Sequence, residues 1–155
     1  MYIICMRHGA AEPESDAVEN RNRRLTEKGI RGAGKTADML RHFLKGNRLT
    51  IYTSPYRRTK QTAEIAAEVC GGSIQAAEEL LQSAWGPVAA HCISGSGPIL
   101  LVGHQPFLQS YLMTVAGAAL KFAPASAAVI DYDPACRQGQ LIGYLSPDLK
   151  KLKKG

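Results

Sequence analysis

The sequence has no long hydrophobic run. None of its apolar stretches approaches the roughly 18 residues that a membrane-spanning helix needs. Its first residues, MYIICMRH, place no basic region ahead of a long apolar one, as a secretory signal would. Hydrophobic residues make up 45% of the 155 residues and charged residues 21%, which is typical of a globular domain with a sizeable core. These features predict a cytoplasmic protein without a membrane partner.

Cysteine pairs are also lacking. The four cysteines show no C-x-x-C spacing and stand singly, mostly in apolar surroundings: Cys5, Cys70, Cys92 and Cys136. Neither a disulfide framework nor a zinc site is expected, and buried thiols are the better prediction. None of them has an arginine six residues later, which excludes the loop of enzymes that attack phosphate with a cysteine.

Aromatic residues are scarce, at 6% of the chain, whereas basic residues are in excess. Lys and Arg number 19 against 13 Asp and Glu, so the formal net charge is +6, part of which comes from the tail KKLKKG. Nucleic-acid binding calls for a basic face interleaved with aromatic side chains, so it is not expected. A basic surface instead favours anionic substrates.

Apolar runs and helical spacing alternate along the chain. Short apolar runs predict strands at residues 1–6, 49–53, 73–76, 99–102, 127–132 and 140–145. Apolar residues at helical spacing predict four helices. The first follows the N-cap Thr26 and ends at Leu44, the second runs from Ser54-Pro55 to Cys70, the third covers 78–92 with an interruption at Gly86-Pro87, and the fourth runs from Pro106 to Val115. Residues 10–24 are polar and predict an irregular loop. The alternation predicts one domain over residues 1–155, a three-layer αβα sandwich with a mostly parallel sheet and helices on both faces.

One stretch fits a nucleotide-binding motif. GIRGAGKT, at residues 29–36, matches G-x-x-x-x-G-K-[ST], the loop that cradles phosphates between a buried strand and a helix. The residues before it, NRNRRLTEK, cannot form a buried strand, and Asp131 is the sole, weak candidate for a later metal-binding acid. The competing interpretation is one helix that tolerates three glycines, each at about 1 kcal/mol relative to alanine. We predict the helix.

Polar groups follow directly after three of the predicted strands. His8 follows YIICM and Arg7, His104 follows ILLV and Gly103, and Ser54-Pro55-Tyr56-Arg57-Arg58 follows LTIYT. Ligands of open α/β sheets bind beyond the carboxyl ends of the strands, where the strand order switches. If these strands are parallel, both histidines and an arginine lie at one edge of the sheet.

Arg57 and Arg58 stand where a predicted helix begins. Cations there oppose the helix dipole, which makes sense if an anion is the real partner. Free N–H groups at a helix N-terminus bind phosphate, and arginine adds a bidentate fork. Two histidines with two arginines, and no acidic cluster for Mg²⁺, favour phosphoryl transfer without a metal or other cofactor.

Three motifs in this order resemble the signature of the histidine phosphatase superfamily. They are Arg7-His8-Gly9, SPYRRTKQTA after the second strand and LLVGHQP after a later one. LTEKG at the start of a helix and the closing GYLSPDLKK extend the resemblance through nearly the whole chain. The resemblance implies a phosphoglycerate mutase-like fold and a hydrolase that forms a phosphohistidine intermediate.

The resemblance also implies roles for particular residues. His8 would attack phosphorus, and His104 would hydrogen-bond the transferring group. Arg7 and Arg58 would neutralise its oxygens, with Arg58 chosen over Arg57 because it stands three residues before Gln61-Thr62. The remaining expected phosphate-binding residues are Gly9, Gln105 and, at the pocket rim, Arg23.

The short chain resembles the phosphohistidine phosphatases of the SixA type. Larger relatives place an acidic proton donor where this chain reads EELLQSAWG, with Gln82 and Ser83 at the expected position. An alkoxide leaving group needs such a donor, worth about 10²–10⁴ in rate, whereas phosphohistidine can leave as neutral imidazole. The predicted activity is therefore the removal of phosphate from phosphohistidine in proteins by a monomeric enzyme.

Two alternatives remain open. A phosphatase of small phosphate esters could use Glu79 as its proton donor. A non-catalytic module could bind a phosphorylated protein without turning it over, although His8 argues against this.

Overall fold

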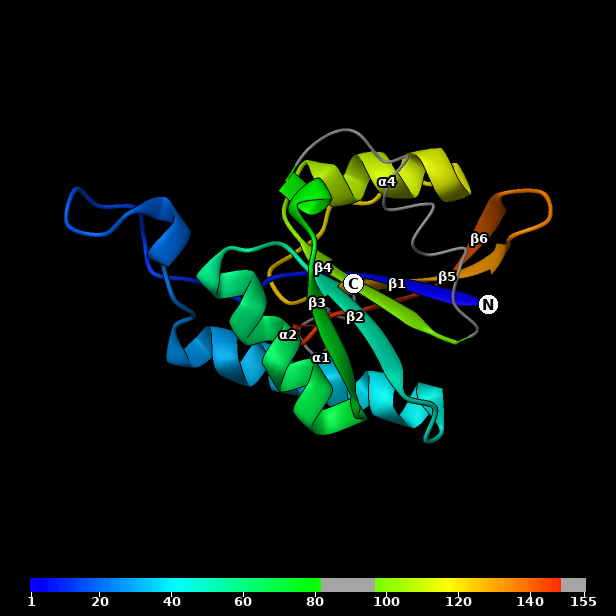
Figure 1. Cartoon of the computed structure of the whole chain (residues 1–155), viewed down its shortest axis with the longest axis horizontal. Coiled ribbons are helices and arrows are strands. Elements are labelled where there is room, and N and C mark those ends of the chain that lie inside the picture. Colours follow the sequence, from blue (N-terminus) through cyan, green and yellow to red (C-terminus); the bar gives the residue numbers. More distant parts are fainter. Residues whose placement is uncertain (82–96, 149–155) are drawn as a thin grey trace, which may run out of the picture.

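The computed structural model describes residues 1–81 and 97–148, in which six strands form one mixed sheet (Figure 1). Their order in the sheet is β3-β2-β4-β1-β5-β6. The strands are β1 (Tyr2–Arg7), β2 (Leu49–Thr53), β3 (Gly72–Ala76), β4 (Ile99–Gly103), β5 (Ala127–Asp133) and β6 (Gln138–Leu145). The β1–β4, β2–β4 and β2–β3 pairs are parallel, whereas β5 and β6 pair antiparallel. All six predicted strands are present, each within a few residues of the expected bounds.

The helices lie on both faces of this sheet. They are α1 (Glu27–Leu44), α2 (Arg57–Cys70) and α4 (Phe107–Ala116), with 3-10 turns η1 (Asn20–Asn22) and η2 (Glu78–Leu81). Figure 1 shows α1 and α2 packed on one face and α4 on the other. The predicted three-layer αβα sandwich with a mostly parallel sheet is thereby confirmed.

Alternation along the central strands builds a separate core on each face of the sheet. In β1, Ile3 and Cys5 pack with Leu108 and Tyr111 of α4, while Ile4 and Met6 belong to the core under α1 and α2. Successive side chains of a strand point to opposite faces, so a run that is apolar throughout fills both cores. This explains why MYIICM carries no polar residue.

Helix α1 contains the whole of the GIRGAGKT stretch. Thr26 caps it, since its hydroxyl oxygen accepts the backbone N–H of Gly29, as the sequence predicted. The strand that a phosphate loop requires does not precede it; residues 10–24 instead form an irregular segment with isolated bridges, a turn at 16–17 and the 3-10 turn η1. The helix interpretation is confirmed.

The first glycine of that stretch has a packing role. A Cβ on Gly29 would collide with the backbone carbonyl of Ala10, and a Cβ on Gly9 would lie 2.6 Å from the carbonyl oxygen of Gly29. The backbone after β1 therefore lies directly against the first turn of α1. Only glycine at both positions allows this contact.

Three local predictions need correction or fall outside the described residues. Helix α2 begins at Arg57 and not at Ser54-Pro55, because Ser54 is held by side-chain contacts and Tyr56 is the extended N-cap residue. Cys136 is exposed, whereas Cys5 is buried as expected. The predicted helix 78–92 is described only at η2, and the rest of it, with Cys92 and the predicted break at Gly86-Pro87, lies outside the described residues.

Within the described part of the chain, no helix combines the length and the apolar character needed to cross a membrane.

The two glycine environments in α1 predict opposite effects of the same substitution. Gly29→Ala should lower the free energy of unfolding by about 1–3 kcal/mol, because its methyl group overlaps the Ala10 carbonyl. Gly34→Ala should raise it by up to about 1 kcal/mol, because a Cβ there meets nothing within 4 Å and alanine favours the helix. Urea unfolding of both variants measures the difference, and equal effects would contradict the close contact.

Candidate active site

The candidate site lies at the carboxyl ends of three neighbouring strands. In the parallel register, Arg7 of β1 pairs with Gly103 of β4, and Thr53 of β2 pairs with Val102. The residues that follow these strands, His8, Ser54 and His104, therefore emerge at one edge of the sheet. The two imidazole rings lie 5.4 Å apart between centroids. The structure thus brings the two histidines together, as the positions of the strand ends predicted.

The imidazole of His8 is oriented by its own chain. Its Nδ1 lies 2.7 Å from the carbonyl oxygen of Gly9, which can only accept, so Nδ1 carries the proton. Nε2 then holds the lone pair and accepts a hydrogen bond from Arg58 Nε at 3.3 Å. Gly9 is fixed in turn, because its N–H donates to Thr62 Oγ1 at 3.1 Å. The unprotonated nitrogen of His8 is thus its Nε2.

Arg58 connects both histidines to the segment that precedes α1. Its side chain is only 7% exposed and donates from Nη1 to the carbonyl of Asn20 at 2.8 Å. Its Nη2 lies 3.5 Å from His104 Nδ1, and its guanidinium carbon lies 4.8 Å from the Tyr56 ring centre. Arg57 is exposed, so the choice of Arg58 over Arg57 agrees with the geometry.

A hydroxyl pair holds His104 on its far side. The backbone carbonyls of Ser54 and Tyr56 share the single hydrogen of Thr59 Oγ1, so this oxygen accepts from Ser54 Oγ at 2.6 Å. Ser54 Oγ then accepts from His104 Nε2 at 2.6 Å. This assignment leaves the lone pair of His104 on Nδ1, facing Arg58. Sequence reasoning missed Ser54 and Thr59, although both lie in the quoted SPYRRTKQTA motif.

Burial and positive charge keep both imidazoles neutral. Burial is the largest cause that lowers the pKa of His8 to about 4, and the charges of Arg58, Arg7 and Arg23 act in the same direction. The hydrogen bond to Gly9 opposes them by raising the pKa. Burial likewise lowers the pKa of His104 to about 3, with help from His8 and the same guanidinium groups. At neutral pH each ring therefore offers a lone pair to its surroundings.

Arg7 and Gln105 lie against one backbone carbonyl. Arg7 Nη1 donates to Phe122 O at 2.8 Å, and Gln105 Nε2 donates to the same oxygen at 3.4 Å. Arg7 Nε and Gln105 Oε1 are buried and have no hydrogen-bond partner among the described residues. Burial lowers the pKa of Arg7, yet a guanidinium stays charged in proteins. Its charge reaches both histidines.

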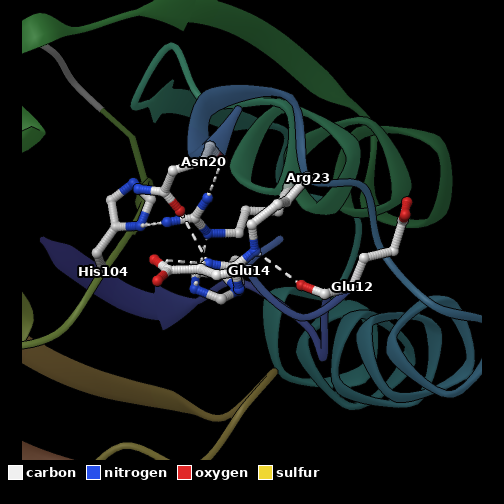
Figure 2. Close-up of polar contacts among 7 residues, drawn as sticks. Glu12, Glu14, Asn20, Arg23 and His104 are labelled. Atoms are coloured by element: carbon white, nitrogen blue, oxygen red, sulfur yellow. Dashed lines mark hydrogen bonds and ion pairs between the residues drawn. The ribbon is translucent and has the colours of Figure 1, made fainter. Parts of the chain in front are cut away.

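The segment between β1 and α1 contributes Arg23, with a carboxylate beside it (Figure 2). Arg23 donates from Nε to Glu12 O at 2.7 Å and from Nη1 to Asn20 Oδ1 at 2.8 Å. Its Nη1 also lies 3.5 Å from Glu14 Oε1, although the Glu14 side chain is 75% exposed. The Glu14 charge also raises the pKa of Arg58, against a larger lowering by burial and Arg23. Glu14 is a member of this site that sequence reasoning missed, because no spacing ties it to the histidines.

One expected residue has another partner, and the expected proton-donor position lies outside the described residues. The N–H of Gly9 is taken by Thr62, so it is not free to bind a phosphate as expected. The side chain of Glu79, and Gln82 and Ser83, lie outside the described residues. Within residues 1–81 and 97–148, no group of three or more His, Cys, Asp or Glu side chains could hold a metal ion.

Paired imidazoles and guanidinium groups at the carboxyl edge of a mixed sheet place the chain among phosphate-handling α/β enzymes. The chain belongs to the histidine phosphatase superfamily (branch 1), whose model matches residues 3–91. This confirms the predicted family and the enzyme class, a phosphatase. No curated protein matches the chain.

Solved structures share the fold over almost the whole chain. The protein histidine phosphatase SixA complexed with tungstate is 22% identical, with a TM-score of 0.83 over 95% of this chain and 97% of that one. A SixA protein from Agrobacterium tumefaciens is 22% identical, with a TM-score of 0.79 over 94% and 97%. A phosphoserine phosphatase from Entamoeba histolytica, complexed with 3-phosphoglyceric acid, is 15% identical, with a TM-score of 0.65 over 94% and 96%. The SixA-type resemblance is therefore confirmed at the level of the fold.

The lowered histidine pKa values predict that stability falls in acid. The unfolded chain binds protons on these rings near pH 6.5, whereas the folded chain does so only near 4 for His8 and 3 for His104. Their contribution is complete above pH 6.5 and is lost as the pH falls, with a slope of at most about 1.4 kcal/mol per pH unit for each ring. Urea unfolding between pH 7 and 5 should show a shallower slope in His104→Asn. Exposed His42→Asn is the control, and an unchanged slope in His104→Asn would contradict the prediction.

Removing the Glu14 charge should strengthen anion binding. The carboxylate lies beside Arg23 and acts on Arg58, so it competes with an oxyanion for the same positive charge. Glu14→Gln should tighten tungstate binding, measured by titration calorimetry, by roughly 3- to 10-fold at low salt. Glu19→Gln removes the same charge from a carboxylate that makes no ion pair within the described residues. Equal effects of the two variants would attribute the change to net charge alone.

Proposed function

We propose that this enzyme removes phosphate from phosphohistidine in proteins, through a phosphoryl intermediate on His8 and without a metal ion. The observation that carries the proposal is the 2.7 Å hydrogen bond from His8 Nδ1 to Gly9 O, which leaves Nε2 unprotonated. A neutral imidazole nitrogen beside guanidinium groups is a competent nucleophile for phosphorus. The substrate would be cytoplasmic, and the enzyme would act as a monomer.

In the first step, the lone pair of His8 Nε2 forms an N–P bond while the bond from phosphorus to the substrate nitrogen breaks. The substrate imidazole leaves as a neutral ring, because it already carries a proton on its other nitrogen. His8 becomes a cationic phosphoimidazole, and the Gly9 carbonyl at Nδ1 stabilises this positive charge. In the second step, water attacks phosphorus and the N–P bond to His8 breaks. Inorganic phosphate is released, and Nε2 regains its lone pair.

The guanidinium groups would bind the phosphoryl oxygens in both steps. Arg58 is within hydrogen-bond distance of His8 Nε2, so it lies where the transferring group must arrive. A buried N–H of Arg7 has no acceptor among the described residues, and an oxyanion could supply one. Arg23 lies at the rim, and Gln105 is retained as a further phosphate-binding residue. Gly9 is not, because Thr62 takes its N–H.

His104 would act as a hydrogen-bond donor once the anion is bound. Its Nδ1 is unprotonated and lies 3.5 Å from Arg58 Nη2. A phosphoryl dianion in contact with this ring would raise its pKa and draw a proton onto Nδ1. Ser54 keeps the other nitrogen in place during this change. The ring could then neutralise charge that builds up on the phosphoryl oxygens.

A phosphatase acting on small phosphate esters is the alternative. The phosphoserine phosphatase from Entamoeba histolytica shares the fold, and it was captured with 3-phosphoglyceric acid. An ester would need a proton donor for its alkoxide, and Glu79 is the candidate. Glu79→Gln should then damage ester cleavage far more than N–P cleavage.

Transfer of label to the enzyme tests the proposed function. A peptide carrying ³²P-phosphohistidine should label the protein on His8, and His8→Ala should take up no label. A matched phosphoserine peptide should transfer its label at least about 100-fold more slowly, because the sequence has Gln82 and Ser83 where a donor to the alkoxide is expected. Rapid acid-free quenching followed by gel autoradiography measures both rates.

His42→Ala serves as the control for this experiment, since His42 is exposed on α1 and contacts only Asp38 among the described residues. It should keep the full label. Label transfer that is faster from phosphoserine would favour the esterase, and no label on well-folded wild-type protein would favour a non-catalytic module.

A further inference from the structure

A basic cavity lies beside the candidate active site. It has a volume of about 350 Å³ and is lined by Arg21, Asn22, Pro55, Arg57 and Lys60. Its lining contains three cationic side chains and no carboxylate. Arg57 and Lys60 are exposed, and neither forms an ion pair with any described residue. Like charges gathered in this way repel each other and attract an anionic partner.

One aromatic ring joins this cavity to the catalytic histidines. The guanidinium carbon of Arg21 lies 5.6 Å from the centre of the Tyr56 ring, which packs edge-on against His104 with centroids 5.0 Å apart. The same ring also contacts Arg58. The cavity is thus built from η1 and the start of α2, the two elements that hold Arg58. A ligand bound in this cavity would lie next to the phosphoryl-transfer site.

A second basic cavity makes a useful comparison. It has a volume of about 390 Å³, and its lining on α1 includes Lys28, Arg31 and Lys35. Asp148 also lines it, so a carboxylate is already present among these cations. Among the described residues, none of its three cations packs on an aromatic ring, whereas Arg21 of the first cavity packs on Tyr56. Both cavities are therefore basic, whereas the contact through Tyr56 to the catalytic site is a property of the first cavity.

We propose that Arg21, Arg57 and Lys60 form a subsite for acidic side chains that flank the phosphohistidine of a protein substrate. This inference rests on the proposed function and adds a specificity to it. The cations come from two elements and all three of them are exposed, which suits carboxylates spread along a polypeptide. A single compact phosphate is bound better by convergent donors such as those around His8. Pro55 offers an apolar contact for the backbone of such a chain.

Two synthetic peptides test the subsite. Each carries one phosphohistidine, flanked by aspartates in the first and by asparagines in the second. Wild-type enzyme at low ionic strength should cleave the aspartate peptide with a kcat/KM about tenfold higher, and added salt should reduce this preference. The double variant Arg57→Gln/Lys60→Gln should lose the preference and keep its rate on the asparagine peptide. Arg21 is left unchanged because it contacts Tyr56.

Lys28→Gln/Lys35→Gln is the matched control, since it removes the same charge from exposed positions of α1. It should retain the preference for the aspartate peptide. Equal cleavage of both peptides by wild-type enzyme would overturn the subsite and leave the proposed function standing, as would loss of the preference in the control variant. Cleavage of neither peptide, with release of phosphate from an alkyl phosphate, would overturn both.

Discussion

The hydrogen bond from His8 Nδ1 to the Gly9 carbonyl is the interaction on which the proposed chemistry of this protein depends. It decides which ring nitrogen carries the proton and therefore which one is available to phosphorus. Its geometry is held from outside the site, because Thr62 takes the Gly9 N–H and Gly29 lies against the same backbone. The packing of α1 and α2 on the sheet thus fixes the tautomer of the candidate nucleophile.

The second constraint is an excess of positive charge close to buried, neutral rings. Arg58 is almost completely buried and lies within hydrogen-bond distance of both histidines. Isolated buried cations are expensive unless they are paired, and Glu14, the carboxylate whose charge acts on Arg58, is exposed and pairs with Arg23 only loosely at 3.5 Å. A site of this kind is completed by an oxyanion. The same excess of positive charge keeps the histidines neutral, since each proton added to them would bring one more positive charge into the site.

Much of the fold follows from patterns that operate over a few residues. Apolar runs predicted every strand of the sheet, and the N-cap at Thr26 predicted where α1 begins. The start of α2 was misplaced because Pro55 favours a helical first turn, while the contacts of Ser54 with Thr59 and His104 delay the helix to Arg57. The contact with His104 joins segments that follow different strands, and no local propensity carries it.

The sequence by itself predicted that His8, His104 and an arginine would meet, because parallel strands carry the residues after them to one edge of a sheet, and the family resemblance chose Arg58 as that arginine. It also excluded the nucleotide loop, since polar residues cannot form the buried strand before it. Only the tertiary structure decided the tautomers, the lowered pKa values and the approach of Glu14 to Arg23. These depend on distances of a few ångströms and on burial, which arise when segments far apart in the chain pack together.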